Sequence, residues 1–180
     1  MMHKDCERIM LTEEQLRTRV KEIAQEVDER YQGKRPLVVG ILKGSIIFYS
    51  DFIRHLTCPV ELDFMAVSSY GSGSVSSGKL KIKKDLDRDV KGRDVIVVED
   101  IIDSGFTLAN LKALLLERGA ASVIIVTLLN KVERREYDIA PDYNCFDIEN
   151  EFVIGYGLDY NEMYRSLPYI GILKRSVYEK

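Results

Sequence analysis

The chain has 180 residues, of which 46% are hydrophobic and 31% are charged, and its formal net charge is −3. This length favours one domain, spanning residues 1–180, that buries roughly 70% of its unfolded surface. The small negative charge argues against a dedicated nucleic-acid-binding protein, which is more often basic, so we expect no nucleic-acid partner.

Cysteine and histidine usage excludes further classes of protein. Cys6, Cys58 and Cys145 are odd in number, far apart and in no C-x-x-C pair, so they predict neither a disulfide framework nor a zinc site. The only histidines are His3, in a terminus expected to be loose, and His55, near the end of an apolar helix-like stretch. Catalysis is therefore not expected to depend on a histidine base.

No targeting or membrane segment is predicted. The first ten residues lack the apolar core of a signal peptide, and no run approaches the ~18 apolar residues of a membrane span. We therefore expect a cytoplasmic protein with no membrane partner.

The first half of the chain alternates helix and strand patterns. Residues 12–33 begin with Thr12 and Gln15 at capping-box spacing and place an apolar residue at every third or fourth position until Gly33, which predicts an amphipathic helix. Three further elements follow: a strand (36–42) that reads as buried on both faces, a helix (45–56) and a strand (59–67).

Residues 68–78, SSYGSGSVSSG, are too rich in Ser and Gly to pack as a core element. The simplest interpretation is a linker. Within a single domain we favour a mobile lid instead, beginning at Ser69 and Tyr70.

The second half continues the alternation. It contains a strand (94–100), a helix (108–120) ended by Gly119, a strand (122–130) and three shorter strand-like pieces (145–149, 151–157 and 169–177). Buried strands that alternate with helices predict an α/β fold with a doubly wound parallel sheet. In such a sheet the ligand crevice lies at the carboxyl ends of the strands.

The strand at 94–100 ends in unusual negative charge. Glu99 and Asp100 follow four β-branched residues, and Asp103 comes three residues later. Burying an unpaired charge costs free energy, so we expect a bound ligand to compensate the cost of burying these carboxylates. Carboxylates accept hydrogen bonds from sugar hydroxyls and bind Mg²⁺, which predicts a ligand with both features.

The turn that follows, DSGFT, predicts an anion site. Gly105 permits a close approach, Ser104 and Thr107 offer hydroxyls, and free N–H groups at a helix start favour phosphate. The turn is neither a Walker A loop nor a G-x-G-x-x-G loop. Asp103 alone could instead be an ordinary helix N-cap.

These residues resemble a known family. VIVVEDIIDSGFT (95–107) is similar to the 5-phosphoribosyl 1-pyrophosphate motif of the type I phosphoribosyltransferases. GILKGS (40–45), LLNKVERR (128–135), the Ser/Gly-rich segment and residues 151–171 resemble the hypoxanthine-guanine phosphoribosyltransferases, chiefly bacterial members, from about Glu7 onward. The resemblance implies a type I phosphoribosyltransferase fold with a small hood subdomain.

The resemblance also implies a reaction. With Mg²⁺ as cofactor, hypoxanthine or guanine displaces pyrophosphate from 5-phosphoribosyl 1-pyrophosphate and gives IMP or GMP. Asp103 is implied as the proton acceptor at purine N7, Glu99 and Asp100 as ligands of the ribose and metal, and Asp159 as a ligand of a second Mg²⁺. The implied 5′-phosphate cradle is Ser104, Gly105 and Thr107.

Pyrophosphate and purine contacts are implied in the same way. Lys43 and Gly44, after an often cis peptide, and Arg165 would bind pyrophosphate. By residue type alone, Lys43 is a solvated loop lysine and Arg165 a surface arginine.

Lys131 would donate to the purine C6 oxygen, Phe152 would stack on the ring, and Val153 would offer backbone groups to its edge. By residue type alone, Phe152 is a core residue. Family members are usually dimers or tetramers, so we expect a homo-oligomer.

Three alternatives stay open at this point. One is a nucleotide- and RNA-binding regulator of pyrimidine genes on the same fold, because fold does not fix function. Another is a related enzyme that uses xanthine, adenine, orotate or uracil. The last is a doubly wound binding domain without turnover.

Overall fold

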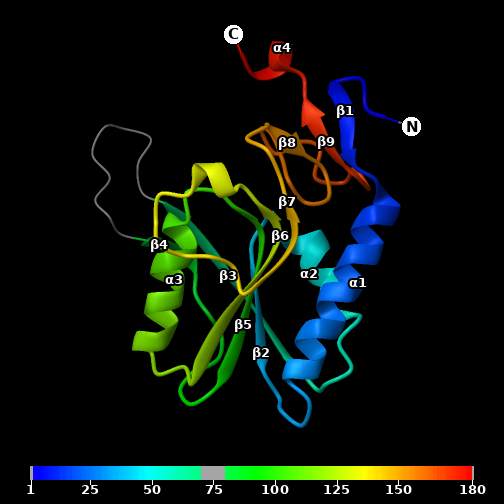
Figure 1. Cartoon of the computed structure of the whole chain (residues 1–180). Coiled ribbons are helices and arrows are strands. Elements are labelled where there is room, and N and C mark those ends of the chain that lie inside the picture. The colour runs from blue at the N-terminus through cyan, green and yellow to red at the C-terminus, as the bar shows by residue number, and fades with distance from the viewer. Residues whose placement is uncertain (1, 70–79, 180) are drawn as a thin grey trace.

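The computed structural model describes residues 2–69 and 80–179, and its centre is a six-stranded sheet (Figure 1). The strand order is β4-β3-β2-β5-β6-β7, in which β4 is antiparallel to β3 and the other neighbours are parallel. The strands are β2 (Leu37–Ile41), β3 (Glu61–Ser69), β4 (Leu80–Lys84), β5 (Asp94–Ile102), β6 (Ser122–Asn130) and β7 (Tyr143–Asp147). The predicted doubly wound α/β sheet is confirmed.

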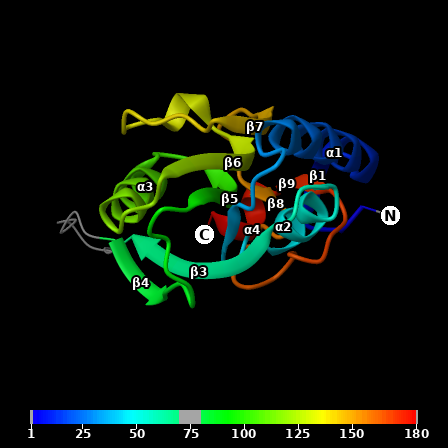
Figure 2. The ribbon, with the colours of Figure 1, turned by 90° about the horizontal axis from the view of Figure 1, so that it is seen from below.

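Helices cover both faces of this sheet (Figures 1 and 2). α1 (Glu13–Arg30) and α2 (Ile46–Ile53) pack on one face, and α3 (Phe106–Glu117) packs on the other. β2 is buried along its whole length, as its apolar run predicts. The predicted capping box is present, because the Thr12 side chain accepts from the Gln15 N–H and the Gln15 side chain accepts from the Thr12 N–H.

A second, smaller sheet forms the hood, residues 2–11 and 151–179, above the carboxyl ends of the parallel strands (Figure 1). Its order is β1-β9-β8, all antiparallel. The hood elements are β1 (Cys6–Leu11), β8 (Val153–Ile154), β9 (Ile170–Leu173) and α4 (Arg175–Tyr178). A 3₁₀ turn, η1 (Val132–Arg134), follows β6 just below the hood.

The structure corrects several expectations. β1 was not expected, and its backbone pairs with β9, more than 150 residues later in the chain. His3 is not loose, because its backbone N–H donates to the Tyr169 hydroxyl at 2.7 Å. β3 continues to Ser69, where it pairs with β4, so Ser69, which was expected to begin the lid, lies in a strand. The rest of the proposed lid, from Tyr70 to residue 78, lies outside the described residues.

Among the residues that are described, no helix is long and apolar enough to cross a membrane.

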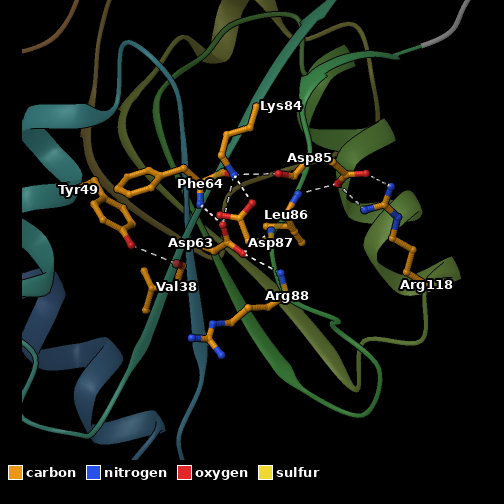
Figure 3. A network of polar contacts seen from close by, with 10 residues as sticks. All are labelled: Val38, Tyr49, Asp63, Phe64, Lys84, Asp85, Leu86, Asp87, Arg88 and Arg118. Carbon is orange, nitrogen blue, oxygen red and sulfur yellow. Dashed lines mark hydrogen bonds and ion pairs between the residues drawn. The ribbon is translucent and has the colours of Figure 1, made fainter.

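A buried carboxylate, Asp63, fixes the return from β4 to the sheet (Figure 3). Asp63 is 4% exposed, and its Oδ2 accepts from the N–H groups of Asp87 at 2.9 Å and Arg88 at 3.2 Å. Its Oδ1 accepts from the Phe64 N–H at 2.7 Å and lies 3.6 Å from Lys84 Nζ. This network anchors the two-stranded arm β3–β4 at its base.

We therefore predict that Asp63→Ala lowers the free energy of unfolding by about 2–4 kcal/mol, because it leaves buried donors without an acceptor. Urea titration of both proteins measures this difference. Asp87→Ala is the matched control, because that carboxylate pairs with the same lysine at 3.3 Å but is 80% exposed. Its cost should stay within about 0.5 kcal/mol. Equal losses in the two variants would contradict the role given to Asp63.

Candidate active site

The carboxyl ends of β2, β3 and β5 enclose a cavity of about 340 Å³. Its lining unites residues that the sequence places far apart. The predicted site residues that line it are Gly44, Glu99, Asp100, Asp103, Ser104, Gly105 and Thr107. Neither histidine lines this cavity, whereas His55 lines the larger cavity described below.

Two adjacent carboxylates lie in the cavity wall. β5 runs two residues beyond its predicted end, so Glu99 and Asp100 stand inside the strand. Burial, together with the neighbouring Asp100 carboxylate, raises the pKa of Glu99. Burial likewise raises the pKa of Asp100, although the positive charge of Arg165 opposes this. Within residues 2–69 and 80–179 neither carboxylate forms a salt bridge, and the charge of Arg165 only partly offsets the effect of burial on Asp100.

The loop after β2 packs tightly against this pair. A Cβ atom on Gly44 would lie 1.6 Å from Asp100 Oδ2, so only glycine fits there. The peptide bond between Leu42 and Lys43 is cis, as the family resemblance implied. From the hood, Gly157 approaches the Gly44 carbonyl so closely that a Cβ on Gly157 would lie 2.0 Å from that oxygen. The loop is thus held between the sheet and the hood.

The turn after β5 has the form of an anion cradle. Gly105 has a φ of +88° and is the N-cap of α3, so the N-cap has no side chain, and the Ser104 hydroxyl accepts from the Phe106 N–H at 3.3 Å. Asp103 is therefore not the N-cap, and the ordinary capping interpretation is wrong. The Ser104 carbonyl accepts from the N–H groups of Glu136 at 3.0 Å and Tyr137 at 3.1 Å. Because first-turn N–H groups lack intrahelical partners, the start of α3 can accept a phosphate.

The residues expected to bind pyrophosphate are engaged with each other. Lys43 Nζ lies 3.0 Å from Glu162 Oε2, and Arg165 Nη2 lies 2.8 Å from Asp159 Oδ1. Arg165 also donates to the Gly157 carbonyl at 2.8 Å. Hydrogen bonds from Lys43 and Arg165 lower the pKa of Glu162. Glu162 was not predicted as a site residue, although its spacing of three from both Asp159 and Arg165 is visible in the sequence.

Arg165 and Asp159 do not line the carboxylate cavity. Arg165 lines a larger cavity of about 490 Å³ between α1, α2 and residues 165–168. That cavity contains neither Glu99 nor Asp103, so we assign the chemistry to the smaller one. Over the described part of the chain, no group of three His, Cys, Asp or Glu side chains is placed to hold a metal ion. Asp159 is not among the residues that line the cavity of the carboxylate pair.

The expected purine contacts lie at the boundary between core and hood. Burial lowers the pKa of Lys131, while the Asp103 carboxylate opposes this shift. Phe152 is 37% exposed, and Val153 is buried in β8. The Phe152 ring stacks on Tyr178 at a centroid distance of 4.9 Å and meets Tyr160 edge-on at 5.5 Å. Part of the ring thus stays open to a planar ligand while its orientation is fixed.

Comparison with known proteins agrees with this geometry. A model of the phosphoribosyl transferase domain matches residues 10–161. The hypoxanthine-guanine phosphoribosyltransferase of Streptococcus thermophilus strain CNRZ 1066 is 49% identical over 180 residues, which are 100% of each chain. The enzyme of the same name from Bacillus subtilis strain 168 is 51% identical over 179 residues, which are 99% of each. A crystal structure of a hypoxanthine phosphoribosyltransferase from Staphylococcus aureus has a TM-score of 0.96 and 46% identity, covering 99% of this chain and 97% of that one.

A fold with a hood above a phosphate turn and a carboxylate pair defines a type I phosphoribosyltransferase. The chain belongs to the phosphoribosyl transferase family. It is an enzyme, a pentosyltransferase.

The contact between Gly44 and Asp100 gives a direct test of the site. We predict that Gly44→Ala lowers kcat/KM by about 10²-fold or more, because the added methyl group displaces either the loop or the carboxylate. Steady-state kinetics and a urea titration separate this effect from unfolding. Gly92→Ala is the control: its φ of +71° is also strained for alanine, but no atom lies within 4 Å of the new Cβ. That variant should lose about 1 kcal/mol of stability and keep its activity. Full activity of Gly44→Ala would refute the close fit.

Proposed function

We propose that the enzyme transfers the 5-phosphoribosyl group of 5-phosphoribosyl 1-pyrophosphate to hypoxanthine or guanine. The products are IMP or GMP and pyrophosphate. The observation that carries this proposal is one cavity in which the carboxylates of Glu99 and Asp100 adjoin the N-terminus of α3. A sugar phosphate meets both needs, because its hydroxyls donate to carboxylates and its phosphate accepts from N–H groups.

Each part of the substrate has a place in this scheme. The turn at Ser104, Gly105 and Thr107 holds the 5′-phosphate, and Glu99 and Asp100 hold the ribose hydroxyls. Lys43, the backbone of Gly44 and Arg165 hold the pyrophosphate. Because Lys43 and Arg165 are paired with Glu162 and Asp159, pyrophosphate binding requires these ion pairs to rearrange.

Bond making and bond breaking occur at C1′ of the ribose. The purine N9 forms a bond to C1′, the bond from C1′ to the pyrophosphate oxygen breaks, and pyrophosphate leaves with that electron pair. The proton on N7 passes to Asp103, whose carboxylate lines the same cavity. A positioned base of this kind is typically worth 10²–10⁴-fold in rate.

A divalent cation fits the donor set. Glu99 and Asp100 are adjacent oxygen donors without a cationic partner among the described residues, and burial opposes their ionisation. Mg²⁺ usually takes one or two carboxylates and completes its shell with water and substrate phosphates. Asp159 would hold a second ion beside the pyrophosphate. When bound, Mg²⁺ neutralises charge on the departing pyrophosphate.

We predict that EDTA abolishes turnover and that excess Mg²⁺ restores it. Without the cation, Glu99 and Asp100 repel a polyanionic substrate. Isothermal titration of 5-phosphoribosyl 1-pyrophosphate with and without Mg²⁺ tests binding independently of turnover. Equal affinity and activity in the two conditions would remove the metal from the scheme.

Base choice rests on Lys131, which is a donor only. Hypoxanthine and guanine present an acceptor oxygen at C6, whereas adenine presents a donor amino group. A charge-assisted hydrogen bond contributes roughly 1.5–3 kcal/mol, so adenine should be disfavoured by about 10²-fold. Guanine's 2-amino group would donate to a backbone carbonyl near Val153.

We therefore predict pyrophosphate release with hypoxanthine and guanine but not with adenine. Lys131→Gln should lower kcat/KM for both 6-oxopurines by about 10-fold or more. It should therefore reduce the ratio of these kcat/KM values to the value for adenine. Lys21→Gln, on the exposed face of α1, is the control and should match the wild type. Comparable kcat/KM values for adenine and hypoxanthine in the wild type would overturn the role of Lys131.

The cellular setting is part of the proposal. We infer a cytoplasmic homodimer or homotetramer, as the family resemblance implies. Ile46 and Ile47, at the start of α2, are 38% and 36% exposed and offer an apolar contact surface.

A further inference from the structure

One ion pair links the proposed base to Arg134, a residue to which the sequence analysis gave no role. Arg134 Nε donates to Asp103 Oδ1 at 2.9 Å, across 31 residues of sequence. Asp103 follows β5, and Arg134 ends η1, which follows β6. The contact therefore joins the exits of two neighbouring strands.

An exposed ion pair usually contributes little to stability, because the entropy cost of ordering two long side chains offsets the Coulomb attraction. The two side chains here are 48% and 45% exposed, so stability alone does not account for the pair. The backbone that carries Arg134, however, is unusually well fixed. Three hydrogen bonds pin it to the phosphate turn and to the end of β5. They run from the N–H groups of Glu136 and Tyr137 to the Ser104 carbonyl and from the Lys131 N–H to the Ile102 carbonyl.

The next side chain strengthens this anchoring. Arg135 Nη2 donates to Asn130 Oδ1, and its Nη1 donates to the Ile139 carbonyl at 3.2 Å. Arg135 Cδ would lie 3.1 Å from a Cβ built on Gly105, so the segment also packs against the phosphate turn. The Arg134 guanidinium is thus carried by a rigid segment. Because the backbone is already ordered, forming the ion pair with Asp103 costs less conformational entropy.

We propose that Arg134 is a positioning residue that holds Oδ1 of Asp103 and thereby leaves Oδ2 to accept the N7 proton. This inference rests on the proposed role of Asp103. An unrestrained aspartate side chain can rotate and present either carboxylate oxygen in many orientations. Restricting this rotation holds Oδ2 nearer to the geometry required for proton transfer.

The nearby ammonium group of Lys131 explains why the orientation of the Asp103 carboxylate requires a partner such as Arg134. Lys131 is close enough for the Asp103 carboxylate to affect its pKa, and the Arg134 charge opposes that effect. If Asp103 turned to Lys131, both the base and the donor for the purine C6 oxygen would be engaged with each other. By engaging Oδ1, Arg134 keeps the two groups available for different atoms of the purine.

The test is a double-mutant cycle with Arg134→Ala and Asp103→Asn. Arg134→Ala should lower kcat by about 10- to 100-fold, while both KM values change less than about threefold. Arg134→Lys, which keeps a donor for Oδ1, should recover part of the loss. In the Asp103→Asn background the Arg134→Ala change should have almost no further effect. Glu133→Ala, in the same exposed turn, is the control and should leave kcat unchanged.

The outcomes separate this inference from the proposed function. Normal kcat in Arg134→Ala, with Asp103→Asn inactive, overturns the positioning role and leaves the base assignment intact. Normal kcat in Asp103→Asn overturns the base itself. A raised KM for 5-phosphoribosyl 1-pyrophosphate at constant kcat shows that Arg134 binds the substrate's anions, which also overturns the inference. Circular dichroism checks that Arg134→Ala folds. If it does not, Arg134→Lys and Arg134→Gln carry the same comparison.

Discussion

The placement of two adjacent carboxylates, the buried Glu99 and the partly buried Asp100, at the end of a central strand is the constraint on which this candidate active site depends. Glu99 ends an otherwise apolar buried run of β5. Burial raises the pKa of both groups, so the protein environment disfavours their ionised forms. In the proposed scheme, hydroxyl donors and a cation that arrive with the substrate would compensate this cost.

The same carboxylates connect the core to the hood. Asp100 leaves room only for glycine at position 44, and the Gly44 carbonyl in turn leaves little room at Gly157. Gly157 and Arg165 exchange hydrogen bonds, from the Gly157 N–H to the Arg165 carbonyl at 2.9 Å and from the Arg165 guanidinium to the Gly157 carbonyl at 2.8 Å. A displacement of the carboxylate pair would therefore reach the hood through backbone contacts, which are less able to adjust than flexible side chains.

The segment after β6 is fixed to the turn that follows β5. It carries Lys131 and Arg134, and its backbone donates twice to the Ser104 carbonyl. The turn, Asp103 and Lys131 are consequently parts of one hydrogen-bonded unit. In the proposed scheme, this unit aligns the phosphate site, the base and the purine donor.

Local sequence was sufficient to predict the helices and strands whose characteristic patterns lie within a few consecutive residues. The capping box at Thr12 and the apolar runs of β2 and β6 predicted their elements, because propensity, periodicity and burial agree there. The acidic strand end and the turn after it likewise predicted a phosphate and sugar site, since their chemistry is contained in one short motif.

Only the tertiary structure decided the features that depend on distant partners. β1 and β4 lie at sheet edges, and their strand hydrogen bonds come from β9 and β3 rather than from their own sequence. The motif alone allowed Asp103 to be a helix cap, and the φ of Gly105 together with the contact from Arg134 excluded that interpretation. Lys43 was predicted from resemblance, but its pairing with Glu162 follows from the way the hood folds over the sheet. A sequence states which groups are available, whereas the packing of remote segments sets which of them meet.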